Sequence, residues 1–292
     1  MNESPPLIYY CTWVFPGFPL WYPFRAVLRL VALPVWTLWC WLMNLALAPL
    51  GLVSRRRLRN ARKSVSRLWC RGMLATMGTR LAARGTFPPE PFFLVTNHIT
   101  GIEAFAINAM FDMTCPIAMY VKGQPVLGRL IAGLDPLWVS QKKSETASLN
   151  ERIINELRNG QNIVIAPEGD ISPGRFVRRF RAGMLESAAM IGYPVHYASV
   201  TYRTPAGWPL ASKAVVYGPD AERAKMIGGI SEEEKALWGN RGPFYKYFLG
   251  LLSLPWHDLV VRFAPDPIVA EDKYTLANQL HDAVESILVP VE

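Results

Sequence analysis

The chain has 292 residues, 51% of them hydrophobic and 12% aromatic, and its formal net charge at pH 7 is +8. This length is enough to bury one full core, and the positive balance favours an anionic partner, either nucleic acid or an acidic lipid surface. Nucleic acid is disfavoured, because no zinc-finger, RNP-type or KH-type spacing accompanies the charge and the basic blocks flank apolar segments.

Residues 1–68 are predicted to form a membrane-associated N-terminal segment. No charged side chain occurs between Leu30 and Ser54, a run long enough to cross a hydrocarbon core of roughly 30 Å as a helix. A basic block follows it at once, made of Arg55, Arg56, Arg57, Arg59, Arg62, Lys63 and Arg67. Because only Arg25 and Arg29 lie upstream, the positive-inside rule puts the C-terminal side of a spanning helix in the cytoplasm.

Two prolines, Pro34 and Pro49, leave the mode of membrane attachment open. They allow the run either to cross the bilayer or to enter one leaflet as a kinked hairpin. The preceding residues 7–24 are also uncharged, and their prolines and aromatic side chains are typical of an interfacial segment. A buried core helix is the third alternative, although core helices of soluble proteins rarely run this long. We expect attachment to the inner or cell membrane, with the rest of the chain on its cytoplasmic face.

Residues 69–292 are predicted to form one α/β domain. Short apolar runs indicate buried strands at 92–96, 117–121, 137–139, 162–166 and 195–202. Helical patterns are expected at 102–110, 149–157, 182–191 and 273–288. The second of these helices has a capping-box spacing in Ser148 and Glu151 at its start, and Gly160 is placed to end it. Strands separated by helices indicate a layered α/β fold with a mostly parallel central sheet flanked by helices, preceded by the N-terminal helical segment.

The first candidate site follows the strand at 92–96 and consists of Asn97, His98 and Glu103. A histidine suits general-base catalysis because its pKa lies near neutrality, and a carboxylate on its other ring nitrogen would fix the tautomer and stabilise the imidazolium. On one continuous helix, side chains five residues apart differ in direction by roughly 140° and would not meet. They meet if His98 lies in a turn and Glu103 in the first helical turn, and Gly101 permits such a turn. By itself the motif also fits a structural histidine.

The second candidate site follows the strand at 162–166. It begins with Pro167-Glu168-Gly169-Asp170 and continues into a basic stretch that contains Arg178, Arg179 and Arg181. In open α/β sheets, ligands bind outside the carboxyl ends of the strands, and both candidate loops lie at such ends. An ordinary surface turn and a solvated basic face are the alternative interpretations of these two segments.

Asn97-His98 with Glu103 resembles the N-H-x-x-x-x-D block of the glycerolipid acyltransferase superfamily, which includes bacterial 1-acylglycerol-3-phosphate acyltransferase. Further blocks of that family have counterparts in the same order. Pro125, Gly128 and Trp138-Val139 resemble the block P-x-x-G with F-V/I-x-R. Pro167-Glu168-Gly169, Ser172, Phe180-Arg181 and Gly183 resemble the block F-P-E-G-T-R-S with P-F-K-x-G. Tyr193-Pro194-Val195 resembles the strand V-P-I/V-x-P. The resemblance covers residues 68–288.

By this resemblance the chain is a membrane-bound O-acyltransferase that moves a fatty acyl group from acyl-CoA or acyl carrier protein to the hydroxyl of a lysophospholipid or related lysolipid. His98 would deprotonate that hydroxyl, Glu103 would orient His98, and backbone N–H groups nearby would hold the developing oxyanion. No covalent acyl-enzyme is needed. The acceptor would be bound by Asn97, Glu168, Gly169, Lys142, Lys143, Arg178 and Arg181.

No cofactor or metal is expected, since the thioester is a co-substrate and His98 lacks clustered ligand partners. The spacing of the cysteines agrees with the expectation that no metal is bound. Cys11, Cys40, Cys70 and Cys115 show no C-x-x-C spacing, so neither a zinc site nor a disulfide framework is indicated, and a reducing compartment is favoured.

Three departures from the family pattern leave the acceptor open. Glu103 replaces the usual Asp, as in lipid A late acyltransferases, Asp170-Ile171 replaces Thr-Arg, and Gln141 replaces an Arg. The two family arginines are thought to hold the phosphate of lysophosphatidic acid, and losing that bidentate grip is not conservative. Either nearby lysines and arginines supply the charge, or the acceptor is a zwitterionic lysolipid, an aminolipid, a glycolipid or a lipid A-type lipid. We favour the second explanation, and a membrane lipid-binding scaffold without catalysis is the alternative from another class.

The stretch 244–256 is apolar and aromatic, and Pro255 lies near its end. It can line an acyl channel or rest on the membrane, although packing in the core is the commoner fate of such a run.

Overall fold

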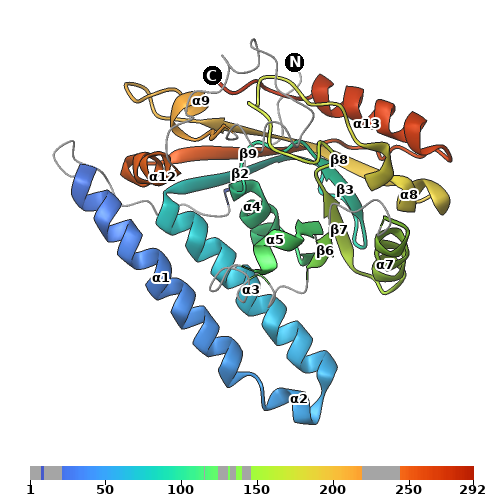
Figure 1. Cartoon of the computed structure of the whole chain (residues 1–292), viewed down its shortest axis with the longest axis horizontal. Coiled ribbons are helices and arrows are strands. Elements are labelled where there is room, and N and C mark those ends of the chain that lie inside the picture. Colours follow the sequence, from blue (N-terminus) through green and yellow to red (C-terminus); the bar gives the residue numbers. More distant parts are fainter. Residues whose placement is uncertain are drawn as a thin grey trace.

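The computed structural model describes residues 8–9, 22–114, 116–123, 131, 136–139, 146–218 and 244–292. Its centre is a seven-stranded sheet with the strand order β1-β2-β9-β8-β3-β7-β4, and a second small sheet pairs β5 with β6 (Figure 1). The strands are β1 (Ile8–Tyr9), β2 (Thr79–Gly85), β3 (Phe93–Thr96), β4 (Met113–Thr114), β5 (Pro116–Ala118), β6 (Leu137–Val139), β7 (Asn162–Ile165), β8 (Val195–Arg203) and β9 (His257–Phe263).

The strands around β3 are parallel. β3 pairs with β7 on one side and with β8 on the other, and β4 continues the parallel set beyond β7. β9 is antiparallel to β8 but parallel to β2. All four residues of β3 are buried, as expected for a strand that is covered on both faces. The predicted α/β fold with a mostly parallel sheet is therefore confirmed, and the carboxyl ends of β3 and β7 lie at the same edge of the sheet.

Helices cover both faces of the sheet (Figure 1). One core joins residues of α1, α3, α4 and α12 with Leu94 of β3, and the other joins residues of α7, α8 and α13 with Phe93 and Val95 of the same strand. The helices are α1 (Tyr22–Ala46), α2 (Leu50–Val53), α3 (Arg55–Met77), α4 (Ile102–Met110), α5 (Met119–Lys122), α7 (Thr146–Arg158), α8 (Glu186–Met190), α9 (Ala211–Ala214), α12 (Phe244–Ser253) and α13 (Lys273–Ser286).

Three of the element predictions need correction. The capping-box interpretation of Ser148 is wrong, because α7 begins at Thr146; apolar spacing defines the face of a helix better than its first residue. The helix expected at 182–191 is split into a 3₁₀ turn (Ala182–Met184) and α8, with buried Leu185 between them. The strand expected at 117–121 ends at Ala118, where α5 takes over.

The helices α1 and α3 run antiparallel beside each other and extend away from the sheet (Figure 1). Trp36 Nε1–H donates to the backbone carbonyl of Trp69 at 3.1 Å, and Trp69 Nε1–H donates to Thr37 Oγ1 at 3.1 Å. Gly72 allows this approach, since a Cβ there would lie 2.0 Å from the Trp36 ring. The domain boundary expected after residue 68 falls inside α3, and the division into two domains stays a prediction.

The outer face of α1 is apolar. Among the described residues, one segment, Phe24–Val53, has the length and hydropathy of a membrane-crossing helix. Every exposed side chain in that segment is apolar, whereas Arg25 and Arg29 are buried and Thr37 and Asn44 are partly buried. A helix with its polar groups turned inward and its apolar groups turned outward has the distribution expected for contact with lipid.

The two arginines of α1 bind the C-terminal end of α12. Arg29 Nη1 donates to the carbonyl oxygens of Leu252 and Leu254 at 2.9 and 2.6 Å, and Arg29 Nη2 donates to that of Pro255 at 3.0 Å. Arg25 Nη1 donates to the Ser253 carbonyl at 3.0 Å. The last carbonyls of a helix have no partner within the helix and carry partial negative charge, so cationic donors stabilise them. These arginines therefore fix α1 to the α/β domain.

The stretch 244–256 contributes to the core on one face of α12. Tyr247, Leu251 and Leu252 are buried, while Tyr245 and Leu249 are exposed on the other face. Core packing thus accounts for the buried half of the stretch.

We predict that Arg29→Met lowers the stability of the protein by about 2–4 kcal/mol, because it leaves three carbonyl groups without their charged donor in a buried place. Thermal unfolding in detergent, followed by circular dichroism, measures the change. Arg59→Met on the exposed face of α3 is the matched control and should unfold like the wild type. An unchanged melting temperature for Arg29→Met would show that the carbonyls of α12 do not need this donor.

Candidate active site

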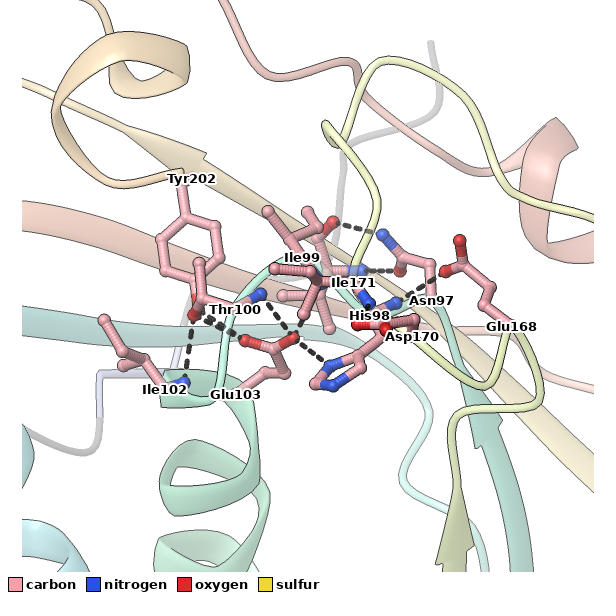
Figure 2. Close-up of polar contacts among 11 residues, drawn as sticks. Asn97, His98, Ile99, Thr100, Ile102, Glu103, Glu168, Asp170, Ile171 and Tyr202 are labelled. Atoms are coloured by element: carbon pink, nitrogen blue, oxygen red, sulfur yellow. Dashed lines mark hydrogen bonds and ion pairs between the residues drawn. The ribbon is translucent and has the colours of Figure 1, made fainter. Parts of the chain in front are cut away.

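The candidate site lies where the chain leaves β3 at the edge of the sheet (Figure 2). Asn97, the first residue after β3, is fully buried and pairs with the backbone of the neighbouring strand. Its Nδ2 donates to the Val200 carbonyl at 3.0 Å, and its Oδ1 accepts from the Val200 N–H at 2.7 Å. The side chain of Asn97 thereby continues the β3–β8 pairing and fixes the start of the loop that carries His98.

The structure brings His98 and Glu103 together. His98 lies in the turn before α4, Glu103 lies in the first turn of α4, and His98 Nδ1 is 2.7 Å from Glu103 Oε1. Gly101, whose φ is −92°, is the residue before that helix. The arrangement is the turn-to-helix geometry that the five-residue spacing required, and Gly101 adopts it without a left-handed conformation.

Glu103 is held by several donors besides His98. Its Oε1 accepts from the backbone N–H groups of Ile99 and Thr100 at 2.7 and 2.8 Å, and its Oε2 accepts from the hydroxyls of Thr100 and Tyr202, each at 2.8 Å. The residue is 3% exposed, so its charge depends on these contacts rather than on water.

The electrostatics of the pair favour an ionised Glu103 and a basic His98. Burial lowers the pKa of His98, but the hydrogen bond to Glu103 and the charges of Glu103, Glu168 and Asp170 outweigh it, so the net pKa lies above the usual value. Burial raises the pKa of Glu103, but His98 and the backbone N–H donors outweigh it, so the net pKa is lowered. Because Nδ1 faces Glu103, Nε2 is the ring nitrogen that remains for an acceptor hydroxyl, and 28% of the His98 side chain is exposed.

The loop after β7 is hydrogen-bonded to the backbone of the loop that carries His98. Glu168 Oε1 accepts from the backbone N–H of His98 at 2.6 Å, and Oε2 accepts from the backbone N–H of Arg178 at 2.9 Å. In return, the Ser172 N–H donates to the His98 carbonyl at 2.7 Å. Burial raises the pKa of Glu168 to about 7 in spite of the two N–H donors. One oxygen of this carboxylate thus ties the two loops together and the other closes the second loop on itself, and its part in acceptor binding stays a prediction.

Gly169 and Arg181 lie against each other in the second loop. Gly169 has a φ of +73°, and a Cβ at this position would lie 2.5 Å from Arg181 Nε, so the arginine side chain crosses the glycine. Arg181 is exposed and Arg178 is partly buried. Asp170, which stands where the family usually has a threonine, is buried beside His98 (Figure 2).

The structure does not test every sequence expectation at this site. Lys142, Lys143 and Gln141 lie outside the described residues. The backbone N–H groups of residues 98, 99 and 100 donate to Glu168 and Glu103, so they do not serve as oxyanion donors in this geometry.

Sequence reasoning missed Thr100 and Tyr202. Thr100 lies between His98 and Glu103 in the sequence, but nothing in the spacing showed that its hydroxyl binds Glu103 rather than water. Tyr202 comes from β8, and Thr100 and Tyr202 are 102 residues apart along the chain. Only the pairing of β8 beside β3 brings it to the site.

The fold, with its histidine–carboxylate pair at the carboxyl end of β3, has a counterpart among solved structures. The structure is similar to that of the 1-acyl-sn-glycerophosphate acyltransferase PlsC from Thermotoga maritima, with a TM-score of 0.52, 14% sequence identity, and coverage of 90% of this chain and 99% of that chain. At this identity the likeness supports the fold alone.

The sequence comparisons match acyltransferases. Residues 80–201, which contain His98, Glu103 and Glu168, match the family model described as Acyltransferase. The chain is 25% identical over 259 residues to a lyso-ornithine lipid O-acyltransferase from Pseudomonas aeruginosa, a match that covers 85% of this chain and 90% of that protein. It is 24% identical over 135 residues to a 1-acyl-sn-glycerol-3-phosphate acyltransferase from Neisseria meningitidis, covering 45% of this chain and 53% of that enzyme. Residues 80–201 carry an acyltransferase domain, and the chain is an acyltransferase, as its resemblance implied.

We predict that Glu103→Gln lowers the pKa of His98, because it removes the charge and the charged hydrogen-bond partner that raise it. NMR titration of the protein labelled at its histidine rings measures this pKa, and His98→Ala assigns the signal. His281, whose ring contacts Asp282 and the Val177 carbonyl, serves as an internal control and should titrate unchanged. A His98 pKa that stays in place in Glu103→Gln would contradict the electrostatic coupling.

Proposed function

We propose that this acyltransferase is bound to a membrane and transfers a fatty acyl group from a thioester to the hydroxyl of a lysolipid, with His98 as the general base and Glu103 orienting it. The observation that carries the proposal is the 2.7 Å contact between His98 Nδ1 and Glu103 Oε1, with Glu103 held by further donors from two elements. This geometry fixes one tautomer and leaves Nε2 to accept a proton.

In the proposed reaction, Nε2 of His98 removes the proton of the acceptor hydroxyl while the oxygen attacks the thioester carbonyl. The C–S bond breaks, the ester forms, and the thiolate leaves and takes up the proton from the imidazolium. Glu103 stays ionised and stabilises the imidazolium between the two steps. The donor is acyl-CoA or acyl carrier protein, and the two are distinguished by assay.

We propose an aminolipid of the lyso-ornithine lipid type as the acceptor, with lysophosphatidic acid as the second candidate. Asp170 contributes negative charge to His98 at a position where the family usually has a neutral residue followed by a phosphate-binding arginine. A carboxylate there disfavours a phosphomonoester and suits a head group that carries an ammonium. The relative named as a lyso-ornithine lipid acyltransferase also matches over most of its length, whereas the match to the Neisseria enzyme covers about half.

We predict that the wild-type protein acylates lyso-ornithine lipid at least about tenfold faster than lysophosphatidic acid, and that His98→Ala lowers the rate about 10²–10⁴-fold because it removes the general base. Purified protein in mixed micelles is supplied with labelled acyl-CoA or acyl carrier protein and each lysolipid in turn. Equal or faster acylation of lysophosphatidic acid would overturn the acceptor assignment. Full activity of His98→Ala would overturn the mechanism, and no transfer to any acceptor would favour the lipid-binding scaffold.

For the membrane, we propose that α1 enters one leaflet and does not cross. α3 packs beside α1, and its first half carries exposed arginines at 55, 57, 59 and 62. Arg67 and Arg71 then join α3 to the α/β domain through Asp112 at 2.5 Å and the Ala109 carbonyl at 3.1 Å. If α1 crossed the bilayer, α3 would have to cross beside it with its arginines in the hydrocarbon, which is costly. The basic end of α3 instead suits the anionic head groups of the leaflet that α1 enters.

We predict that single cysteines at positions 57 and 271 react from the same side of a sealed membrane. Position 57 begins α3, and position 271 is exposed on the α/β domain. In a background without the native cysteines, an impermeant maleimide should label both from the cytoplasmic side only. Labelling of position 57 from the opposite side would establish a spanning α1.

A further inference from the structure

Tyr202 brings a hydroxyl from a distant strand to the carboxylate that binds His98. Its OH is 2.8 Å from Glu103 Oε2 and 2.9 Å from Thr100 Oγ1, and Thr100 Oγ1 is also 2.8 Å from Glu103 Oε2 (Figure 2). The three oxygen atoms therefore form a closed triangle. Tyr202 is 1% exposed, so water does not replace either contact.

The number of protons in this triangle limits which group can donate a hydrogen bond to which. Each hydroxyl has one proton, and an ionised carboxylate has none, so at most two of the three contacts are hydrogen bonds at one time. Thr100 Oγ1 also accepts from the Ile102 N–H at 2.9 Å, which turns its own proton towards an acceptor. Burial and the nearby charge of Glu103 raise the pKa of Tyr202 well above its usual value, so its hydroxyl remains a donor. In every arrangement that satisfies these conditions, at least one hydroxyl donates to Glu103 Oε2.

The two oxygens of Glu103 have separate partners. Oε1 binds the His98 loop through Nδ1 and two backbone N–H groups, while Oε2 binds the hydroxyls. Since Oε1 alone faces the histidine, the hydroxyls on Oε2 fix the rotation of the carboxylate about its last bond. They also draw electron density away from the oxygen that holds His98.

We propose that Tyr202, together with Thr100, is a positioning residue of the acyl transfer, which holds Glu103 ionised and oriented against His98. The inference rests on the proposed role of His98 as the base. Tyr202 touches neither the substrate nor the reacting atoms in this role, and its influence passes through Glu103. It explains how a glutamate is accommodated where the family usually has an aspartate, because the longer side chain is held at both of its oxygens.

The proposal predicts the direction in which the acid limb of the kcat/KM profile moves when Tyr202 is replaced. His98 must be neutral to act as a base, so kcat/KM rises with pH through the pKa of the free enzyme's imidazole. Tyr202→Phe removes a donor from Glu103 and leaves more negative charge facing His98, which favours the imidazolium. The acid limb of the kcat/KM profile is therefore expected to move to higher pH, with kcat reduced about tenfold or less by the looser carboxylate. KM for the lysolipid should change little.

The chain offers a matched control in Tyr247 of α12. This tyrosine is also buried, and its hydroxyl donates to the Val215 carbonyl at 2.7 Å. Tyr247→Phe should lower thermal stability to a similar extent and leave the acid limb in place. Glu103→Gln should move the limb to lower pH, the direction opposite to Tyr202→Phe, since it removes the charge. Glu168 and Asp170, the other charged groups that act on His98, are unchanged in all three variants.

The experiment measures kcat and kcat/KM against pH for the wild type and these variants in detergent micelles, with the acceptor that gives the highest rate. A Tyr202→Phe variant with a wild-type acid limb and wild-type kcat would overturn the inference, and an unmoved limb with only lower stability would assign Tyr202 to the core. If Tyr202→Phe does not fold, Thr100→Val and Thr100→Ser are compared instead. The proposal requires the acid limb to move in Thr100→Val and to stay in place in Thr100→Ser. Full activity of His98→Ala would instead defeat the proposed function, whatever the tyrosine variants do.

Discussion

The charge on Glu103 is the constraint around which the rest of the site is arranged. A carboxylate that is 3% exposed has lost its hydration, and leaving it charged and unpaired in the interior would cost several kcal/mol, a large part of the stability of a typical domain. The protein meets this cost locally, with two backbone N–H groups of the His98 loop and the imidazole itself, and at long range, with the hydroxyl of Tyr202. The conformation of the loop, the start of α4 and the register of β8 beside β3 all have to agree for these donors to converge.

The second carboxylate, Glu168, binds the backbone of the loop that carries His98. It joins the loop after β7 to the N–H of His98, and Ser172 joins it to the carbonyl of the same residue. His98 is therefore fixed at its main chain by the loop after β7 and at its ring by Glu103 of α4. Because β3 and β7 are adjacent parallel strands, their carboxyl ends bring these two loops together.

Much of this could be predicted from the sequence, and the part that could not has a physical reason. Apolar runs and periodicity predicted β3, α4, β7 and β8. The contact between His98 and Glu103 was expected from a turn at Gly101. β2 and β9 were not predicted, since Arg80 and Arg84 in one and Asp258 and Arg262 in the other interrupt the apolar pattern. Arg80 and Asp258 are cross-strand partners at 2.6 Å, a relation that no local window contains. Tyr202 was missed for the same reason, because its partner is about a hundred residues away. The role assigned to Arg25 and Arg29 in membrane orientation overlooked their use as donors to α12, which only the packing of α1 reveals.

The contact between α1 and α12 is made to main-chain carbonyls, and this affects how the sequence can vary. The two guanidinium groups recognise residues 252–255 by their backbone oxygens, Arg25 at Ser253 and Arg29 at the other three, and are indifferent to the side chains there. The partner positions are free to drift as long as the helix ends at the same place, whereas Arg29 itself has no substitute of equal shape, since lysine lacks the planar fork that reaches three oxygens. The contact between the apolar helix α1 and the α/β domain is thus asymmetric in its evolutionary freedom, with the fixed half carried by α1 and the variable half by α12.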